Sequence, residues 1–126
     1  MNDILITSGF IQMILAVGLG WVMTGFYKGT GRSGPFRSAK RVLQGHIDNI
    51  LMALLQFGIA AVHPEVPVGA GVLLLIGSWV NPQLFLIIAT YEDEAAAAKK
   101  LRHLTTTSFM TLTIAYPWLL ISWLMR

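Results

Sequence analysis

The residues with the most chemical potential gather in one stretch, 41–56, where charged sequence gives way to a long apolar run. His46 supplies an imidazole, Asp48 a carboxylate and Asn49 an amide, so this stretch could ligate a metal or orient a polar substrate. After Asp48 no charged residue appears until Glu65, which is typical of a membrane-spanning segment. Ionisable groups at that depth are costly and are usually functional, so each of them needs a partner.

A helical wheel divides these polar residues between two faces. With 3.6 residues per turn, one face carries His46, Asn49, Ala53 and Gln56, and another carries Arg41, Gln44 and Asp48. We expect the second group to satisfy one another near the lipid headgroups, which is a structural role. His46 has two amides and a small residue beneath it, and Ala53 leaves room for a flat or bulky group against the helix.

His46 could act as a metal ligand or only as a hydrogen-bonding group. One histidine cannot hold a structural zinc, which takes four ligands, and the chain has no cysteine. A haem needs a single axial histidine and an apolar slot, and the chain offers both. His103 is expected on the same side of the membrane, whereas His63 lies at the far end of the same helix. A His46 that bonds a neighbouring helix or a lipid phosphate remains the alternative.

Four apolar runs must position these residues. They predict an all-α integral membrane protein, a single domain over 1–126 with four transmembrane helices in an up-down bundle. The expected helices span about 4–27, 38–62, 67–90 and 93–125. Charged residues make up only 12% of the chain, against about a quarter in soluble domains. The net charge of +3 is too thinly spread for nucleic-acid binding.

Loop charges and prolines predict the topology. The loops 28–41 and 91–103 hold five and three of the nine Lys and Arg residues. The positive-inside rule therefore places both loops in the cytoplasm and both termini outside. Pro64 and Pro67 predict a tight hairpin between the second and third helices. Pro82, between the amides Asn81 and Gln83, is expected to kink or loosen the third helix.

The order of these elements resembles the styrene oxide isomerases and the related hydroxylaminobenzene mutases. These small membrane proteins have four helices and carry a histidine at the start of the second helix. In the mutases an acid follows two residues later, and a Trp-x-Asn element lies in the third helix. Here the matching residues are His46, Asp48 and the sequence Trp79-Val80-Asn81. The resemblance covers most of the chain.

The resemblance implies a haem b protein of a bacterial inner membrane, assembled as a homotrimer with haem between subunits. His46 would be the axial iron ligand, with Trp79 and Ala53 near the haem and with Asn81 and Asn49 in the pocket. Ferric haem would act as a Lewis acid in a rearrangement without net redox change. The substrate would be a small hydrophobic epoxide or aryl hydroxylamine that reaches the site within the lipid bilayer.

Two positions depart from the pattern of the isomerases. Met52 stands where they have an asparagine, and Phe85 stands where they have a substrate-binding tyrosine. Phenylalanine keeps the ring and loses the hydroxyl donor. Asn49 is a candidate replacement from a neighbouring turn. The sequence therefore predicts haem binding more strongly than it predicts styrene oxide chemistry.

Two other functions stay open. A b-type electron-transfer cytochrome would use two histidines for each haem, for which His46 and His103 are the candidates. A non-catalytic membrane accessory subunit or a small transporter would use Asn81-Pro82-Gln83 as a broken helix that lines a path.

Overall fold

The computed structural model describes all 126 residues and contains helices only, with no strands. Its elements are α1 (Asn2–Phe26), α2 (Ala39–Val62), α3 (Val68–Ile88), α4 (Glu94–Lys100) and α5 (Arg102–Leu124). The four longer helices are all long and apolar enough to cross a membrane. The predicted all-α membrane fold with four spans is confirmed.

The ends of the helices follow local sequence signals. Ser38 caps α2, because its hydroxyl oxygen accepts the Arg41 N–H at 3.4 Å. Asp93 caps α4 in the same way through the Ala96 N–H at 3.0 Å. The segment expected as one helix, 93–125, is instead two helices that meet at Leu101. Glu94 of α4 bonds Arg41 of α2, whereas α5 packs on α3.

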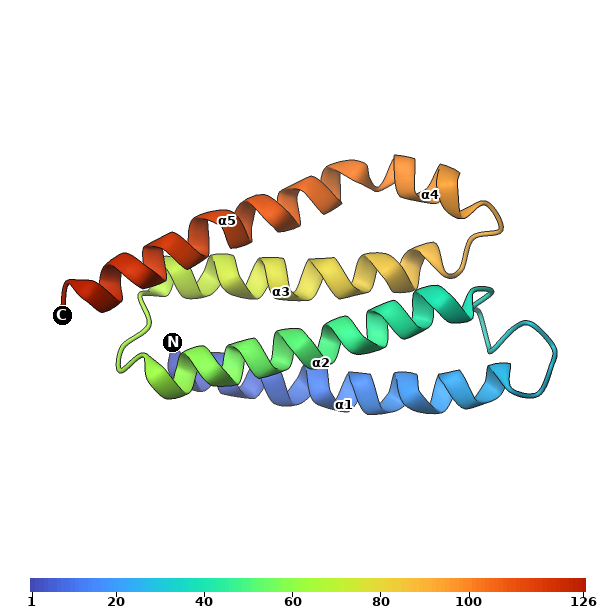
Figure 1. Cartoon of the computed structure of the whole chain (residues 1–126), viewed down its shortest axis with the longest axis horizontal. Helices are drawn as coiled ribbons and strands as arrows, with labels where there is room; N and C mark the ends of the chain where they lie inside the picture. The colour runs from blue at the N-terminus through green and yellow to red at the C-terminus, as the bar shows by residue number, and fades with distance from the viewer.

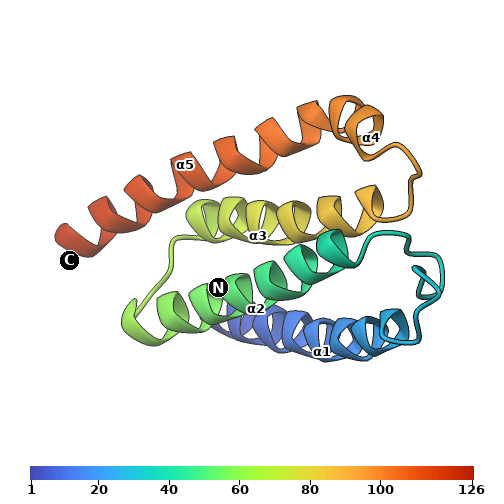
Figure 2. The same ribbon diagram turned by 45° about the vertical axis from the view of Figure 1, so that its right-hand side comes forward.

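The chain runs up and down, with both termini at one end of the molecule and both basic loops at the other (Figure 1). Each long helix packs mainly on its neighbour in the chain: α1 on α2, α2 on α3 and α3 on α5. Among the long helices α5 contacts only α3, and Figure 2 shows it on the far side of α3 from α1. The arrangement is therefore open, and most of the apolar surface of α5 faces outward.

Pro82 removes one backbone hydrogen bond from α3, and the side chain of Gln12 supplies the missing donor. Pro82 lies inside α3, where its missing N–H leaves the carbonyl of Ser78 without its helical donor. The buried side chain of Gln12 on α1 donates to that carbonyl at 2.8 Å. Gln56 on α2 donates to Gln12 Oε1 at 2.6 Å and to Ser78 Oγ at 3.0 Å. This buried amide cluster of Gln12, Gln56 and Ser78 ties three helices together at the proline.

Glycine allows α2 and α3 to approach closely at Gly45. A Cβ atom added there would lie 2.7 Å from Leu86 Cδ2 and 3.2 Å from the backbone oxygen of Pro82. Replacing Gly45 with alanine should therefore destabilise the fold by about 1–3 kcal/mol through overpacking. Thermal unfolding in detergent would measure the loss. Gly58→Ala is the matched control, because a Cβ atom there meets nothing within 4 Å; equal losses in the two variants would contradict the close-approach argument.

Candidate functional site

The ring of His46 is held in one tautomer. Its Nδ1 lies 2.8 Å from the backbone oxygen of Ala16 on α1. A carbonyl oxygen can only accept, so Nδ1 must carry the proton and, in the neutral ring, Nε2 keeps its lone pair. Nε2 has no hydrogen-bond partner, and the residue is only partly buried. This is the arrangement found in metal-bound histidines, where a second-shell acceptor orients the ring and raises its basicity.

His46 is partly exposed at the boundary between α1 and α2. The ring lies beside small residues of α1, and a Cβ atom at Gly20 would sit 3.7 Å from its Cε1 atom. None of the five cavities of the structure is lined by His46. No group of three or more metal-ligating side chains surrounds it. His46 is thus a single candidate ligand, oriented by Ala16, on the surface between α1 and α2.

The face predicted to continue below His46 exists, but it is covered by the other helices. Asn49, Ala53 and Gln56 each expose 0% of their surface. Asn49 donates to the Gly45 carbonyl at 2.8 Å and accepts from Gln83 at 3.2 Å. The expectation that Ala53 leaves room for a flat group is wrong within one chain, because the residue is packed inside it. His46 escapes burial because it lies at the edge of this face.

The expected group of Arg41, Gln44 and Asp48 forms only in part. Arg41 donates to Gln44 at 2.9 Å, but its other partner is Glu94 at 2.8 Å. Asp48 bonds Asn81 on α3 instead, accepting from the Asn81 side-chain amide. The prediction that Asp48 belongs to a group with Arg41 and Gln44 is therefore wrong, because Arg41 bonds Glu94 and Asp48 bonds Asn81. The chain's ion pairs leave Asp48 without a cation.

The structure does not bring all predicted site residues to His46 in a single chain. The Asp48–Asn81 pair lies against α3, on the other flank of α2. Trp79 donates its indole N–H to Ser8 Oγ at 2.7 Å. Ser8 is eight residues from Ala16, or about 12 Å along α1. Within one chain, Trp79 and Asn81 therefore lie apart from the free nitrogen of His46.

His46 and His103, the two candidate haem ligands of an electron carrier, do not come together within one chain. His103 is exposed on the first turn of α5, and α5 makes no contact with α2. His63 directly follows α2, outside the helix, and its Nε2 is 2.9 Å from Ser122 Oγ of α5. A second axial histidine would have to come from another chain.

Sequence reasoning missed the amide cluster at Pro82. The available signal was Gln12, the one polar amide within the apolar run between Asp3 and Lys28. An amide in such a run usually has a buried partner, because unpaired polar groups are costly in lipid. The identity of that partner depended on how α1 packs against α3.

Glu94 joins the two basic loops and should make stability depend on pH. Hydrogen bonds from Ser38 and then from Arg41 hold the pKa of Glu94 below its ordinary value of 4.5. The stabilisation is therefore complete above that value and is lost as the pH falls through the lowered pKa. We expect Glu94→Gln to remove about 0.5 kcal/mol at pH 7 and almost nothing at low pH.

Thermal unfolding in detergent at pH 3 and pH 7 would measure this difference. Glu65→Gln is the control, since Glu65 is exposed and its carboxylate makes no hydrogen bond or ion pair within the chain. A Glu94→Gln variant whose stability differs from the parent equally at both pH values would contradict the linkage.

Comparison with protein-family models, with curated proteins and with solved structures found no match to this chain. The site is therefore interpreted from its own geometry. It offers one free imidazole nitrogen on the α1–α2 surface and one carboxylate–amide pair on the α2–α3 surface. In chemical terms, His46 offers one nitrogen ligand, and the Asp48–Asn81 pair offers polar groups on the other side of α2.

Proposed function

We propose that this membrane protein binds haem b through His46 and promotes the rearrangement of a small hydrophobic substrate. The observation that supports this proposal is the fixed tautomer of His46. Its Nδ1–H donates to the Ala16 carbonyl, and its Nε2 has no hydrogen-bond partner. In the neutral ring, this hydrogen bond leaves the lone pair of Nε2 available to a metal. Ferric haem, when bound, supplies a Lewis acid for an epoxide or an aryl hydroxylamine.

The residues around His46 fit one side of a haem. The Ala16 carbonyl accepts the Nδ1–H, so in the neutral ring Nε2 is the nitrogen that would bind iron. Ala16 and Gly20, which lie beside the ring, are small and apolar, so they leave space for a porphyrin edge. One chain supplies no opposite wall, because Ala53 and Asn49 are buried inside it. The site is therefore incomplete in a single copy.

A homotrimer would complete the site. Rotation about an axis along the membrane normal keeps every residue at its depth. Asp48 lies two residues from His46 on α2, so a neighbouring copy can bring its Asp48–Asn81 pair to the depth of a haem on His46. Asn81 is then the candidate polar contact for substrate. Asn49 is not a suitable replacement for the donor absent at Met52, because both ends of its amide are engaged inside the chain.

The proposed location is a bacterial inner membrane with both basic loops in the cytoplasm. Four membrane helices place the loops 28–41 and 91–103 at one end and the termini at the other. The excess of Lys and Arg in those loops supports the orientation. A hydrophobic substrate would reach the α1–α2 surface from the bilayer.

The absorption spectrum of the protein purified after expression with haem supply tests the cofactor. We expect a Soret band and a ferric iron that binds added cyanide or imidazole readily, as an open sixth position requires. The same sample should convert an aryl epoxide or an aryl hydroxylamine to an isomer of equal mass. A colourless protein, after haem reconstitution, would overturn the proposal. A low-spin spectrum that resists added ligand would instead favour the b-type electron carrier with a histidine from each of two chains.

A further inference from the structure

Three cations surround the break between α4 and α5. Lys99 and Lys100 close α4, Arg102 begins α5, and all three side chains are exposed. Leu101 between them has φ −90° and ψ 3°, which ends the first helix before the second begins. We call Lys99, Lys100 and Arg102 the α4–α5 elbow.

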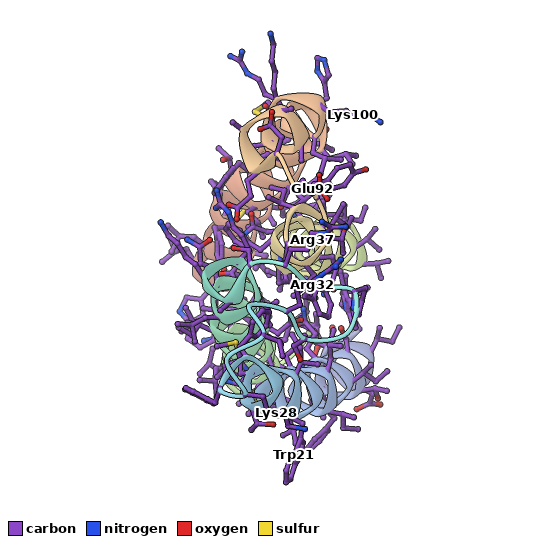
Figure 3. All side chains as sticks on the ribbon, turned by 90° about the vertical axis from the view of Figure 1, so that its right-hand side faces the viewer. Trp21, Lys28, Arg32, Arg37, Glu92 and Lys100 are labelled. Carbon is purple, nitrogen blue, oxygen red and sulfur yellow. The ribbon has the colours of Figure 1, made fainter.

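The elbow keeps its positive charge because the acids at this end of the molecule are engaged elsewhere. Glu92 pairs with Arg37, and Glu94 pairs with Arg41. Asp93 accepts the Ala96 N–H as the cap of α4. In Figure 3, viewed from the loop end, Lys100 lies at the α4 edge of the molecule, beyond Glu92 and Arg37. No carboxylate in the chain forms an ion pair with the elbow.

The elbow lies where α5 enters the apolar layer, directly before an apolar hollow. Leu104, two residues after Arg102, lines a cavity of about 320 Å³ between α3 and α5. The other lining residues come from α3: Trp79, Val80, Gln83, Leu84 and Ile87. Five of the six lining residues are hydrophobic. Arg102 and Leu104 are two residues apart, so the elbow and the hollow lie within one helical turn of each other along α5.

We propose that the elbow and this hollow together bind an anionic glycerophospholipid. Its phosphate would contact the elbow, because clustered Lys and Arg at the membrane boundary attract anionic headgroups. One acyl chain would lie along Leu104, Ile87 and Val80 in the hollow. The bound lipid would then join α5 to α3, the only long helix that α5 contacts. The hollow favours a lipid over a soluble anion, which has no apolar part to place there.

Thermal unfolding of the full chain in detergent, with added lipid, tests the site. Dioleoylphosphatidylglycerol should raise the unfolding temperature by several degrees over dioleoylphosphatidylcholine. The variant K99Q/K100Q/R102Q should lose this rise in unfolding temperature. Native mass spectrometry should show that the variant retains about one tenth as much phosphatidylglycerol as the parent, or less. The control K28Q/R32Q/K40Q removes equal charge at the same end of the molecule, and it should keep most of the rise.

Two further measurements distinguish a defined lipid site from diffuse charge attraction and from binding of a soluble anion. Val80→Trp fills the hollow and leaves the elbow intact, and it should also weaken lipid retention. If the two triple variants lose the rise in unfolding temperature equally, the lipid is attracted diffusely by charge and has no defined site. That result would overturn the proposal. An equal temperature rise with inorganic phosphate would overturn the lipid as ligand. None of these measurements involves His46, so their outcome is independent of haem binding.

Discussion

Replacing His46 with alanine is expected to abolish the Soret band and to lower haem affinity by at least about 100-fold. The reason is geometric. His46 is the only histidine on the surface between α1 and α2, and its Nε2 is the free nitrogen there, while Ala16 holds Nδ1. Absorbance titration of the purified apoprotein with haem measures the loss. The fold should survive, because the variant removes one interhelical hydrogen bond.

The controls for this prediction are the variant His103→Ala and the rescue of His46→Ala by imidazole. His103→Ala should keep the spectrum, since His103 is exposed on α5 and remote from α2. Millimolar imidazole should restore a Soret band to His46→Ala by occupying the space of the lost ring. An unchanged band in His46→Ala, or an equal loss in His103→Ala, would remove His46 as the axial ligand.

The second large effect is expected at Gln12, inside the membrane. Gln12→Leu should destabilise the protein by about 1–3 kcal/mol, because it leaves the Ser78 carbonyl with no donor. In an ordinary helix the N–H four residues later would serve this carbonyl, but that residue is Pro82. The loss should appear in thermal or denaturant unfolding in detergent.

A double-mutant cycle with Pro82→Ala tests the mechanism directly. Alanine at 82 supplies the missing N–H, so Q12L/P82A should recover much of the stability that Q12L loses. The Ser78 carbonyl would then accept the N–H of residue 82, so leucine at position 12 would leave no acceptor unpaired. If P82A changes the stability of Q12L and of the parent by the same amount, Gln12 does not act through the orphaned carbonyl. Gln56→Leu is a useful comparison, since its amide contacts Gln12 and Ser78 Oγ but not that carbonyl.

Local chemistry made much of the fold predictable. Apolar runs longer than a bilayer is thick, interrupted by charged loops and by Pro64 and Pro67, determine four spans whatever their neighbours are. The caps at Ser38 and Asp93 are equally local, because each side chain serves the first turn of its own helix. The break at Leu101 was not predicted, because no glycine or proline lies near it and the local sequence favours one continuous helix.

The candidate site shows the same division. The periodicity of α2 determined by itself that His46, Asn49, Ala53 and Gln56 share a face, and that Asp48 does not. Only the tertiary structure decided that α1 and α3 cover Ala53 and Asn49, that Ala16 holds His46, and that Asp48 pairs with Asn81. The physical reason is that a helix fixes the angles between its own side chains. Which of those side chains are buried depends on the neighbouring helices. The contacts with those helices join residues that are far apart in the sequence.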